Sequence, residues 1–187
     1  MSPIYAAALE MERACTAEGF RFCFIGGLAV QRWGEPRMTA DVDLTLLTGF
    51  GGEERYVDAL LARFVARLAD AREFALQHRT LLLVAANGVH LDVSLGAMPF
   101  EERAVEHASA FAIGAGEALT TCSAEDLVVH KAFAGRDKDW LDIRGIAIRQ
   151  GVRLDRARVW AELTPLLELR GDGAEATAAR LRRAFGE

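Results

Sequence analysis

The chain has 187 residues, of which 51% are hydrophobic and 26% are charged, and its formal net charge is −5. This length supports one hydrophobic core with room for a small appended domain. The negative charge argues against a protein that coats DNA or RNA, because such binding needs a basic surface. The charge is uneven, however, since residues 136–187 carry 11 Lys and Arg against 9 Asp and Glu.

The three cysteines, Cys15, Cys23 and Cys122, form no CxxC pattern and have no nearby histidine pair. A structural zinc site is therefore not expected. The first residues lack the pattern of a secretory signal, and no apolar run approaches the roughly 18 residues of a membrane span. We expect a reduced, cytoplasmic protein that does not bind a membrane.

The first part of the chain alternates helical and extended patterns. Apolar residues recur at helical spacing before Gly19, and an aromatic, β-rich segment then ends at the pair Gly26-Gly27. Polar and apolar side chains alternate after Asp41, as in a half-buried strand. The patterns predict helices over 4–18, 28–33 and 53–71 and strands over 20–25 and 41–46.

The central part reads as a hairpin and the C-terminal part as helices. Asn87-Gly88 favours a type I′ turn between strands at 81–86 and 90–95. Ser123 resembles an N-cap, because acidic residues follow it. We expect an α+β fold with a mixed sheet in a core domain over 1–120 and a helical bundle over 121–187 packed on that core. The bundle helices are predicted near 124–135, 137–150, 155–170 and 173–185.

Three aspartates point to a site for a hard cation. A period of two places Asp41 and Asp43 on one face of their strand, with Cα atoms roughly 6.5 Å apart. The same parity puts Asp92 on the polar face of the later strand. Such carboxylates suit Mg²⁺ or Mn²⁺ bound jointly with substrate phosphates. Taken alone, the DxD pattern also fits a solvated strand edge.

The pair Gly26-Gly27 lies between a predicted strand and a predicted helix. Without a Cβ atom, backbone N–H groups at the start of a helix can approach a phosphate closely. A tight turn is the alternative explanation for the same two residues. A phosphate turn beside a carboxylate pair indicates nucleotide chemistry more strongly than either feature alone.

Four segments resemble the nucleotidyltransferase superfamily typified by DNA polymerase β, and within it the AbiEii-like group of toxin nucleotidyltransferases. They begin with Phe24-Ile25-Gly26-Gly27-Leu28-Ala29 and Arg37-Met38-Thr39-Ala40-Asp41-Val42-Asp43-Leu44. They continue with Leu91-Asp92-Val93 and a helical motif that includes Lys131, Asp139 and Asp142. The resemblance spans residues 24 to about 145.

This resemblance implies that a metal-bound nucleoside triphosphate is attacked by a hydroxyl and that pyrophosphate leaves. It assigns catalysis and metal binding to Asp41, Asp43 and Asp92. It assigns nucleotide binding to Gly26, Gly27, Arg37, Thr39, Lys131 and Asp139, with Lys131 neutralising the triphosphate. Arg37 can equally form a surface ion pair, and Asp139 and Asp142 can pair with Lys138 or Arg136, which is the favoured reading for Asp142.

Two other protein classes fit part of the sequence. Asp41-Val42-Asp43-Leu44-Thr45 matches the DxDxT pattern of haloacid-dehalogenase-like phosphatases, but Pro36 disfavours the buried strand that this class needs before Asp41. A catalytically inactive nucleotide-binding relative is disfavoured because all three carboxylates, the glycines and Lys131 are present.

The sequence does not decide between two kinds of acceptor molecule. A toxin-like enzyme would modify RNA, such as tRNA, or protein, and would have a cognate antitoxin. An antibiotic-resistance-like enzyme would modify a small molecule. Net acidity favours a cationic small acceptor, whereas the C-terminal arginines favour a polyanion.

Overall fold

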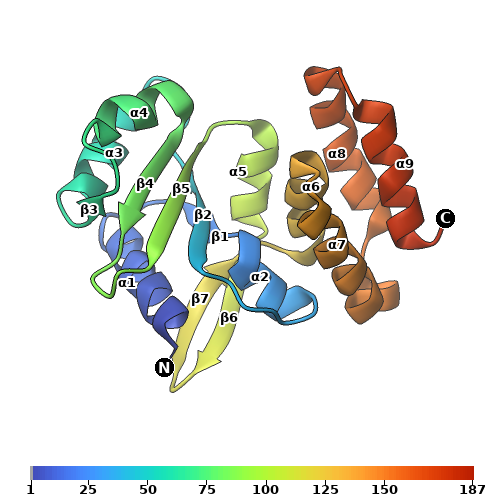
Figure 1. Ribbon diagram of the computed structural model, residues 1–187, viewed down its shortest axis with the longest axis horizontal. Helices are drawn as coiled ribbons and strands as arrows, with labels where there is room; N and C mark the ends of the chain where they lie inside the picture. The colour runs from blue at the N-terminus through green and yellow to red at the C-terminus, as the bar shows by residue number, and fades with distance from the viewer. Residues whose placement is uncertain (1) are drawn as a thin grey trace. The chain divides into compact units, whose positions relative to one another are not determined.

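The computed structural model describes residues 2–187 (Figure 1). The chain divides into two compact units. Unit 1 contains the described residues up to Leu28 together with Met38–Cys122, and unit 2 contains Ala29–Arg37 together with Ser123–Glu187. The division passes through α2 (Gly26–Trp33). The expected domains over 1–120 and 121–187, and the packing of the second on the first, stay predictions.

Unit 1 contains a mixed seven-stranded sheet in the order β3-β4-β5-β2-β1-β7-β6 (Figure 1). β2 pairs in parallel with β5, β1 pairs in parallel with β7, and the other pairs are antiparallel. The predicted α+β fold with a mixed sheet is thus confirmed. The strands are β1 (Phe22–Phe24), β2 (Asp41–Leu47), β3 (Val65–Ala66), β4 (Thr80–Val84), β5 (His90–Gly96), β6 (Ser109–Gly114) and β7 (Glu117–Thr121).

Alternation along the central strands separates a core face from a polar face. Val42, Leu44 and Leu46 of β2 are fully buried, and β5 buries its own alternate apolar residues in the same cluster. Apolar side chains of the helices complete this cluster. Burial of these side chains is the main favourable contribution to folding, roughly 25 cal/mol per Å² of apolar surface. The helices that contribute to the cluster are α1 (Pro3–Ala17), α2 through Leu28, α3 (Glu53–Leu61) and α4 (Ala71–His78).

The hairpin between β4 and β5 forms, but its turn is not the predicted type I′. A type I′ turn needs positive φ at both central residues. Here the amide of Gly88 donates to the carbonyl of Ala85, and of the loop residues only Gly88 has a positive φ, at 84°. Asn87 instead accepts a hydrogen bond from the Val89 amide through its side chain. The loop therefore follows the longer pattern in which a glycine bulge ends the turn.

The single helix predicted over 53–71 is wrong. α3 ends at Leu61, Phe64 is buried in the core, and Val65 and Ala66 form the edge strand β3 against β4. The apolar spacing continues past Leu61, but the backbone extends because β4 offers unpaired hydrogen-bonding groups. Among the described residues, five α-helices and strands were not predicted, namely β3, α4, α5 (Pro99–Glu106), β6 and β7.

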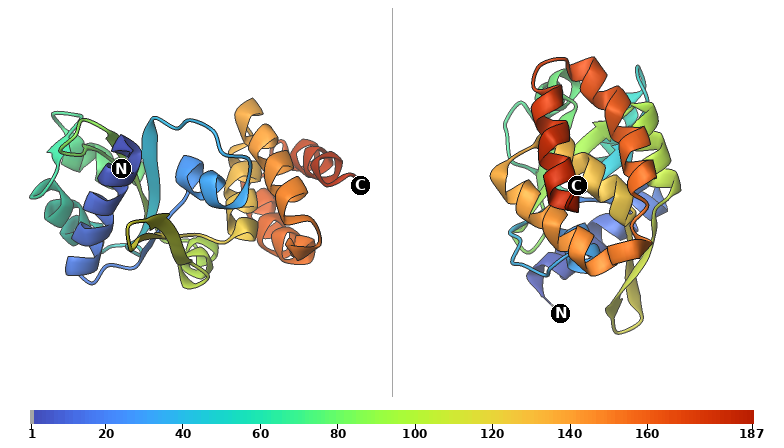
Figure 2. Two further views of the ribbon diagram at one scale, coloured as in Figure 1. Left: turned by 90° about the horizontal axis from the view of Figure 1, so that it is seen from below. Right: turned by 90° about the vertical axis from the view of Figure 1, so that its right-hand side faces the viewer.

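Unit 2 contains the predicted helical bundle, which Figure 2 shows in orange and red. α6 packs against α7 and α8, and α9 packs against all three. Ser123 caps α6, since its Oγ accepts from the Asp126 amide at 3.2 Å. A short 3₁₀ helix, Gly151–Arg153, follows α7. The bundle helices are α6 (Ala124–Ala134), α7 (Asp137–Gln150), α8 (Arg156–Arg170) and α9 (Ala174–Phe185).

The three cysteines are buried and form no disulfide. Burial raises the pKa of the Cys15 thiol to about 12, so this side chain stays uncharged in the core. Within residues 2–187, every helix is too short or too polar to cross a membrane.

Leu83→Ala should lower the free energy of unfolding by about 2–5 kcal/mol, because Leu83 is fully buried and a cavity would remain. Val65→Ala is the control, since Val65 is 71% exposed, and should cost about 0.5 kcal/mol or less. Urea unfolding monitored by circular dichroism measures both. Equal losses would contradict the assigned core face.

Candidate active site

The carboxylates of β2 and β5 lie on adjacent parallel strands in unit 1. Asp43 pairs with Asp92 in the strand register, and Asp41 pairs with His90. All three aspartates are partly buried, whereas the residues that alternate with them are in the core. The backbone therefore presents Asp41, Asp43 and Asp92 on one face of the sheet, as the alternation predicted.

Two of these carboxylates already have charged or ionisable neighbours. Arg67 Nη2 lies 2.8 Å from Asp92 Oδ1 in an ion pair, although the geometry is not that of a hydrogen bond. His90 Nδ1 lies 3.6 Å from Asp41 Oδ1. Among residues 2–187, no three or more His, Cys, Asp or Glu side chains are gathered closely enough to hold a metal ion as they stand.

The donor set nevertheless fits a divalent cation in type and placement. Carboxylate oxygens are the ligands that Mg²⁺ prefers, and Mg²⁺ needs only one or two protein carboxylates when substrate phosphates complete its shell. Asp41 and Asp43 are two residues apart on one strand face, and Asp92 is the cross-strand neighbour of Asp43. The side chain of Asp92 would have to share its charge between Arg67 and the cation.

The glycine turn is packed against the carboxylate strand. Gly26 has a φ of 57°, and a Cβ atom there would come within 2.0 Å of Asp43 Oδ2. A Cβ atom on Gly27 would come within 2.3 Å of Thr39 Oγ1. The Thr39 hydroxyl itself donates to the Asp41 carbonyl at 3.1 Å. Both glycines are thus required by close internal packing, in addition to the phosphate access that the sequence suggested.

A second group of predicted residues converges in unit 2. Lys131 is only 5% exposed, and its Nζ lies 2.6 Å from Asp142 Oδ2 and 3.4 Å from Asp139 Oδ1. Arg37 donates to both oxygens of Asp142, at 2.8 and 2.9 Å. Arg136 donates to Asp139 at 2.7 Å. A role in nucleotide binding stays a prediction for Arg37, Lys131 and Asp139.

The partners of Asp142 differ from the favoured prediction. Asp142 binds Arg37 and Lys131, and of the two residues predicted as its partners, Arg136 binds Asp139 instead. Burial tends to raise the pKa of the Asp142 carboxyl, but the hydrogen bonds from Arg37 and Lys131 outweigh burial and lower it. Sequence spacing on one helix could not reveal these partners, because Arg37 is 105 positions away.

Sequence reasoning also missed Arg67, the cationic neighbour of Asp92. Arg67 follows β3, and its amide donates to the Leu82 carbonyl at 3.0 Å, which holds its backbone beside β4. Its residue type gave no signal, since it lay inside a predicted helix. Only the pairing of β3 with β4 brings it near Asp92.

Two solved structures have a fold similar to that of this chain. One is the crystal structure of an antigenic nucleotidyltransferase-like protein from Paracoccidioides brasiliensis, with a TM-score of 0.53 and 16% identity over 98% of this chain and 96% of that chain. Another is the solution structure of the antibiotic-resistance factor ANT(2'')-Ia, with a TM-score of 0.54 and 16% identity over 93% of this chain and 96% of that chain. At these identities the likeness shows the fold alone. No protein of curated function matches the sequence.

The mixed sheet with its carboxylate strands thus has the fold of the nucleotidyltransferases. The family model described as "Nucleotidyl transferase AbiEii toxin, Type IV TA system" matches residues 9–184. The chain belongs to this family, and it is a nucleotidyltransferase, an enzyme that transfers a nucleoside monophosphate. The resemblance stated from the four sequence segments is confirmed.

Gly27→Ala should lower the free energy of unfolding by about 1–3 kcal/mol, because the new Cβ atom overlaps the side chain of Thr39. The loss should be smaller in a Thr39→Gly background, where that side chain is absent. A double-mutant cycle by urea unfolding measures the coupling. Gly52→Ala is the control and should cost less, since its Cβ would meet only the Thr48 carbonyl oxygen, at 3.7 Å. Additive losses at positions 27 and 39 would contradict the close contact.

Asp142→Asn should lower the free energy of unfolding by about 3–5 kcal/mol at neutral pH, because buried Lys131 loses a charged partner. Folding lowers the pKa of the Asp142 carboxyl. The charged carboxylate therefore stabilises the folded state at pH values above the unfolded pKa of about 3.9. This stabilisation is lost as the pH falls through the pKa of the folded state. The difference in the free energy of unfolding between wild type and variant should therefore become smaller in acid. Urea unfolding from pH 7 to pH 3 measures it. A gap that is independent of pH would exclude the charge as its cause.

Proposed function

We propose that the enzyme transfers a nucleoside monophosphate from a nucleoside triphosphate to a hydroxyl of an RNA or protein acceptor, with a divalent cation held by Asp41, Asp43 and Asp92. The observation that carries the proposal is the pairing of Asp43 with Asp92 on adjacent parallel strands, with Asp41 on the same face. The contact between Asp43 and the Gly26 backbone supports a joint site for cation and phosphate.

In this proposal the acceptor hydroxyl attacks the α-phosphorus, and the bond to the leaving pyrophosphate breaks. Asp92 accepts the hydroxyl proton on the carboxylate oxygen that does not face Arg67. The backbone N–H groups that follow Gly26 at the start of α2 receive the phosphates. A bound Mg²⁺ or Mn²⁺ would neutralise charge at the phosphates. Positioning of the two substrates supplies most of the remaining rate enhancement.

The family description supports a toxin role with a cognate antitoxin as the biological setting of this transfer. The alternative acceptor is a small cationic molecule, as for an antibiotic-resistance factor. One observation favours it, because unit 1, which carries the three aspartates, has 8 Lys and Arg against 15 Asp and Glu and hence a net charge of −7. An acidic surface attracts cationic acceptors.

Labelled triphosphates distinguish these acceptors. The enzyme is incubated with each of the four α-labelled ribonucleoside triphosphates and Mg²⁺, together with cellular RNA, cellular protein or an aminoglycoside. Label in the RNA or protein fraction supports the main proposal, and label in the aminoglycoside alone supports the alternative. Transfer that persists undiminished in EDTA would contradict the cation site.

Asp43→Asn should reduce the rate of transfer by roughly a thousandfold or more, since a lost cation ligand removes several kcal/mol of transition-state stabilisation. Thermal stability without metal should be unchanged or slightly higher, because asparagine keeps the shape of the side chain and removes repulsion between carboxylates. Single-turnover transfer and thermal melting measure the two effects. Asp70→Asn, at an exposed position, is the control and should leave both unchanged. Near-normal transfer by Asp43→Asn would overturn the proposed site.

A further inference from the structure

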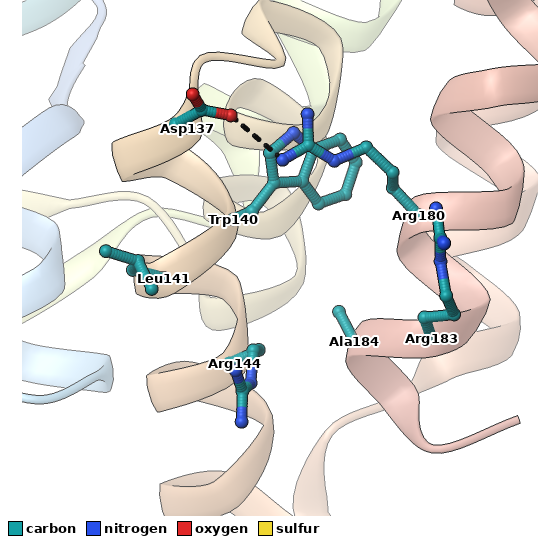
Figure 3. A pocket seen from close by; sticks show the side chains of 7 residues that line it. All are labelled: Asp137, Trp140, Leu141, Arg144, Arg180, Arg183 and Ala184. Atoms are coloured by element: carbon teal, nitrogen blue, oxygen red, sulfur yellow. Dashed lines mark hydrogen bonds and ion pairs between the residues drawn. The ribbon is translucent and has the colours of Figure 1, made fainter.

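Unit 2 contains a basic groove between α7 and α9. Its cavity has a volume of about 590 Å³, and Arg144 of α7 and Arg180 and Arg183 of α9 line it (Figure 3). This volume is in the range of cavities that hold ligands the size of a nucleotide or larger. Since both helices belong to the same bundle, the groove is part of unit 2 itself.

The three arginines are not equivalent. The Arg180 guanidinium stacks over the Trp140 ring at 4.8 Å and forms an ion pair with Asp137 at 3.0 Å (Figure 3). Asp137 is the one acidic residue among those that line the groove, and Arg180 already pairs with it. Arg144 and Arg183 are exposed, and within residues 2–187 neither side chain has an assigned hydrogen bond or ion pair. Two guanidinium groups on separate helices are therefore available to an anion.

The net charge of unit 2 also favours binding of an anion. Unit 2 carries 14 Lys and Arg against 12 Asp and Glu, a net charge of +2, although the complete chain has −5. Many of the arginines in this unit are bound internally, as Arg37 and Arg158 are by buried carboxylates. The exposed arginines of the groove are not neutralised in this way.

We infer that the groove between α7 and α9 binds the phosphodiester backbone of RNA, with Arg144 and Arg183 each contacting a phosphate. A guanidinium fork matches two phosphate oxygens, and two such groups in one groove suit a ligand with repeated phosphates. The exposed Leu141, at 68%, and the Arg180 guanidinium plane offer surfaces for sugars and bases. An acidic peptide would also bind the arginines, but it has no sugars or bases to contact Leu141 and the Arg180 guanidinium plane.

The inference rests on the proposed function only in the choice of RNA among polyanions, and binding can be measured without transfer. The probe is a short fluorescein-labelled single-stranded RNA of mixed sequence, titrated with the full chain in EDTA and without triphosphate. Fluorescence anisotropy is recorded over a series of salt concentrations.

Arg144→Gln and Arg183→Gln should each weaken RNA binding by roughly tenfold, the effect of losing one charge-assisted contact. Each should also reduce the slope of log affinity against log salt by about 0.7, the value for one phosphate on a single strand. Arg153→Gln is the matched control, because it removes the same charge from an exposed position outside the groove. Circular dichroism checks that all three variants are folded.

Four outcomes of the binding experiments would overturn the inference. The first is wild-type protein that does not bind the RNA, and the second is an equal loss in Arg153→Gln, which would reflect net charge alone. The third is displacement of RNA by inorganic tripolyphosphate at equal phosphate concentration, which would make the groove a small-anion site. The fourth is equal displacement by an oligoglutamate peptide, which would indicate an acidic protein partner. RNA binding that depends on the groove, without transfer to RNA, would support the inference and contradict an RNA acceptor. Transfer to RNA that is unchanged in both arginine variants would support an RNA acceptor and contradict the inference.

Discussion

β2 and β5 pair in parallel over seven residues, and this register places Asp43 directly opposite Asp92. The side-chain period of a strand is two, so a slip of one residue would turn Asp92 into the core and expose its apolar neighbours. The buried residues Leu91, Val93 and Leu95 therefore fix the register through their own burial. The same hydrophobic burial that stabilises unit 1 thereby sets the relative positions of the carboxylates on its polar face.

Close packing adds a second constraint to the same region. The turn at Gly26 lies against the Asp43 carboxylate, and the amide of Ile25 donates to the Asp43 carbonyl at 2.9 Å. The turn and the aspartate are thus held together by backbone as well as side-chain contacts. A phosphate at the start of α2 and a cation at Asp43 would be neighbours for this reason, and a side chain at position 26 would disturb both.

Unit 2 uses its charges differently. Arg37, Lys131 and Arg136 surround two buried carboxylates on α7, so these cations and anions largely satisfy one another. Such a network is costly to break, because removal of one member leaves a buried charge without its partner. Arg158 makes a comparable tie from α8 to Asp126 at the start of α6. The network accounts for why Arg37, far away in sequence, groups with the C-terminal helices.

Local sequence determined much of the molecule. Alternation fixed the face of Asp41, Asp43 and Asp92, and helical spacing with Ser123 as a cap predicted the four helices of the bundle, because both depend on neighbours within a few residues. Four short segments sufficed to identify the superfamily.

Local patterns could not decide where a chain segment finds its partners. The helix predicted over 53–71 gave way to the edge strand β3, which satisfies hydrogen-bonding groups on β4, and that strand brings Arg67 to Asp92. The partners of Asp142 and the two arginines that face one groove likewise come from residues far apart in the chain, so only tertiary packing could bring them together.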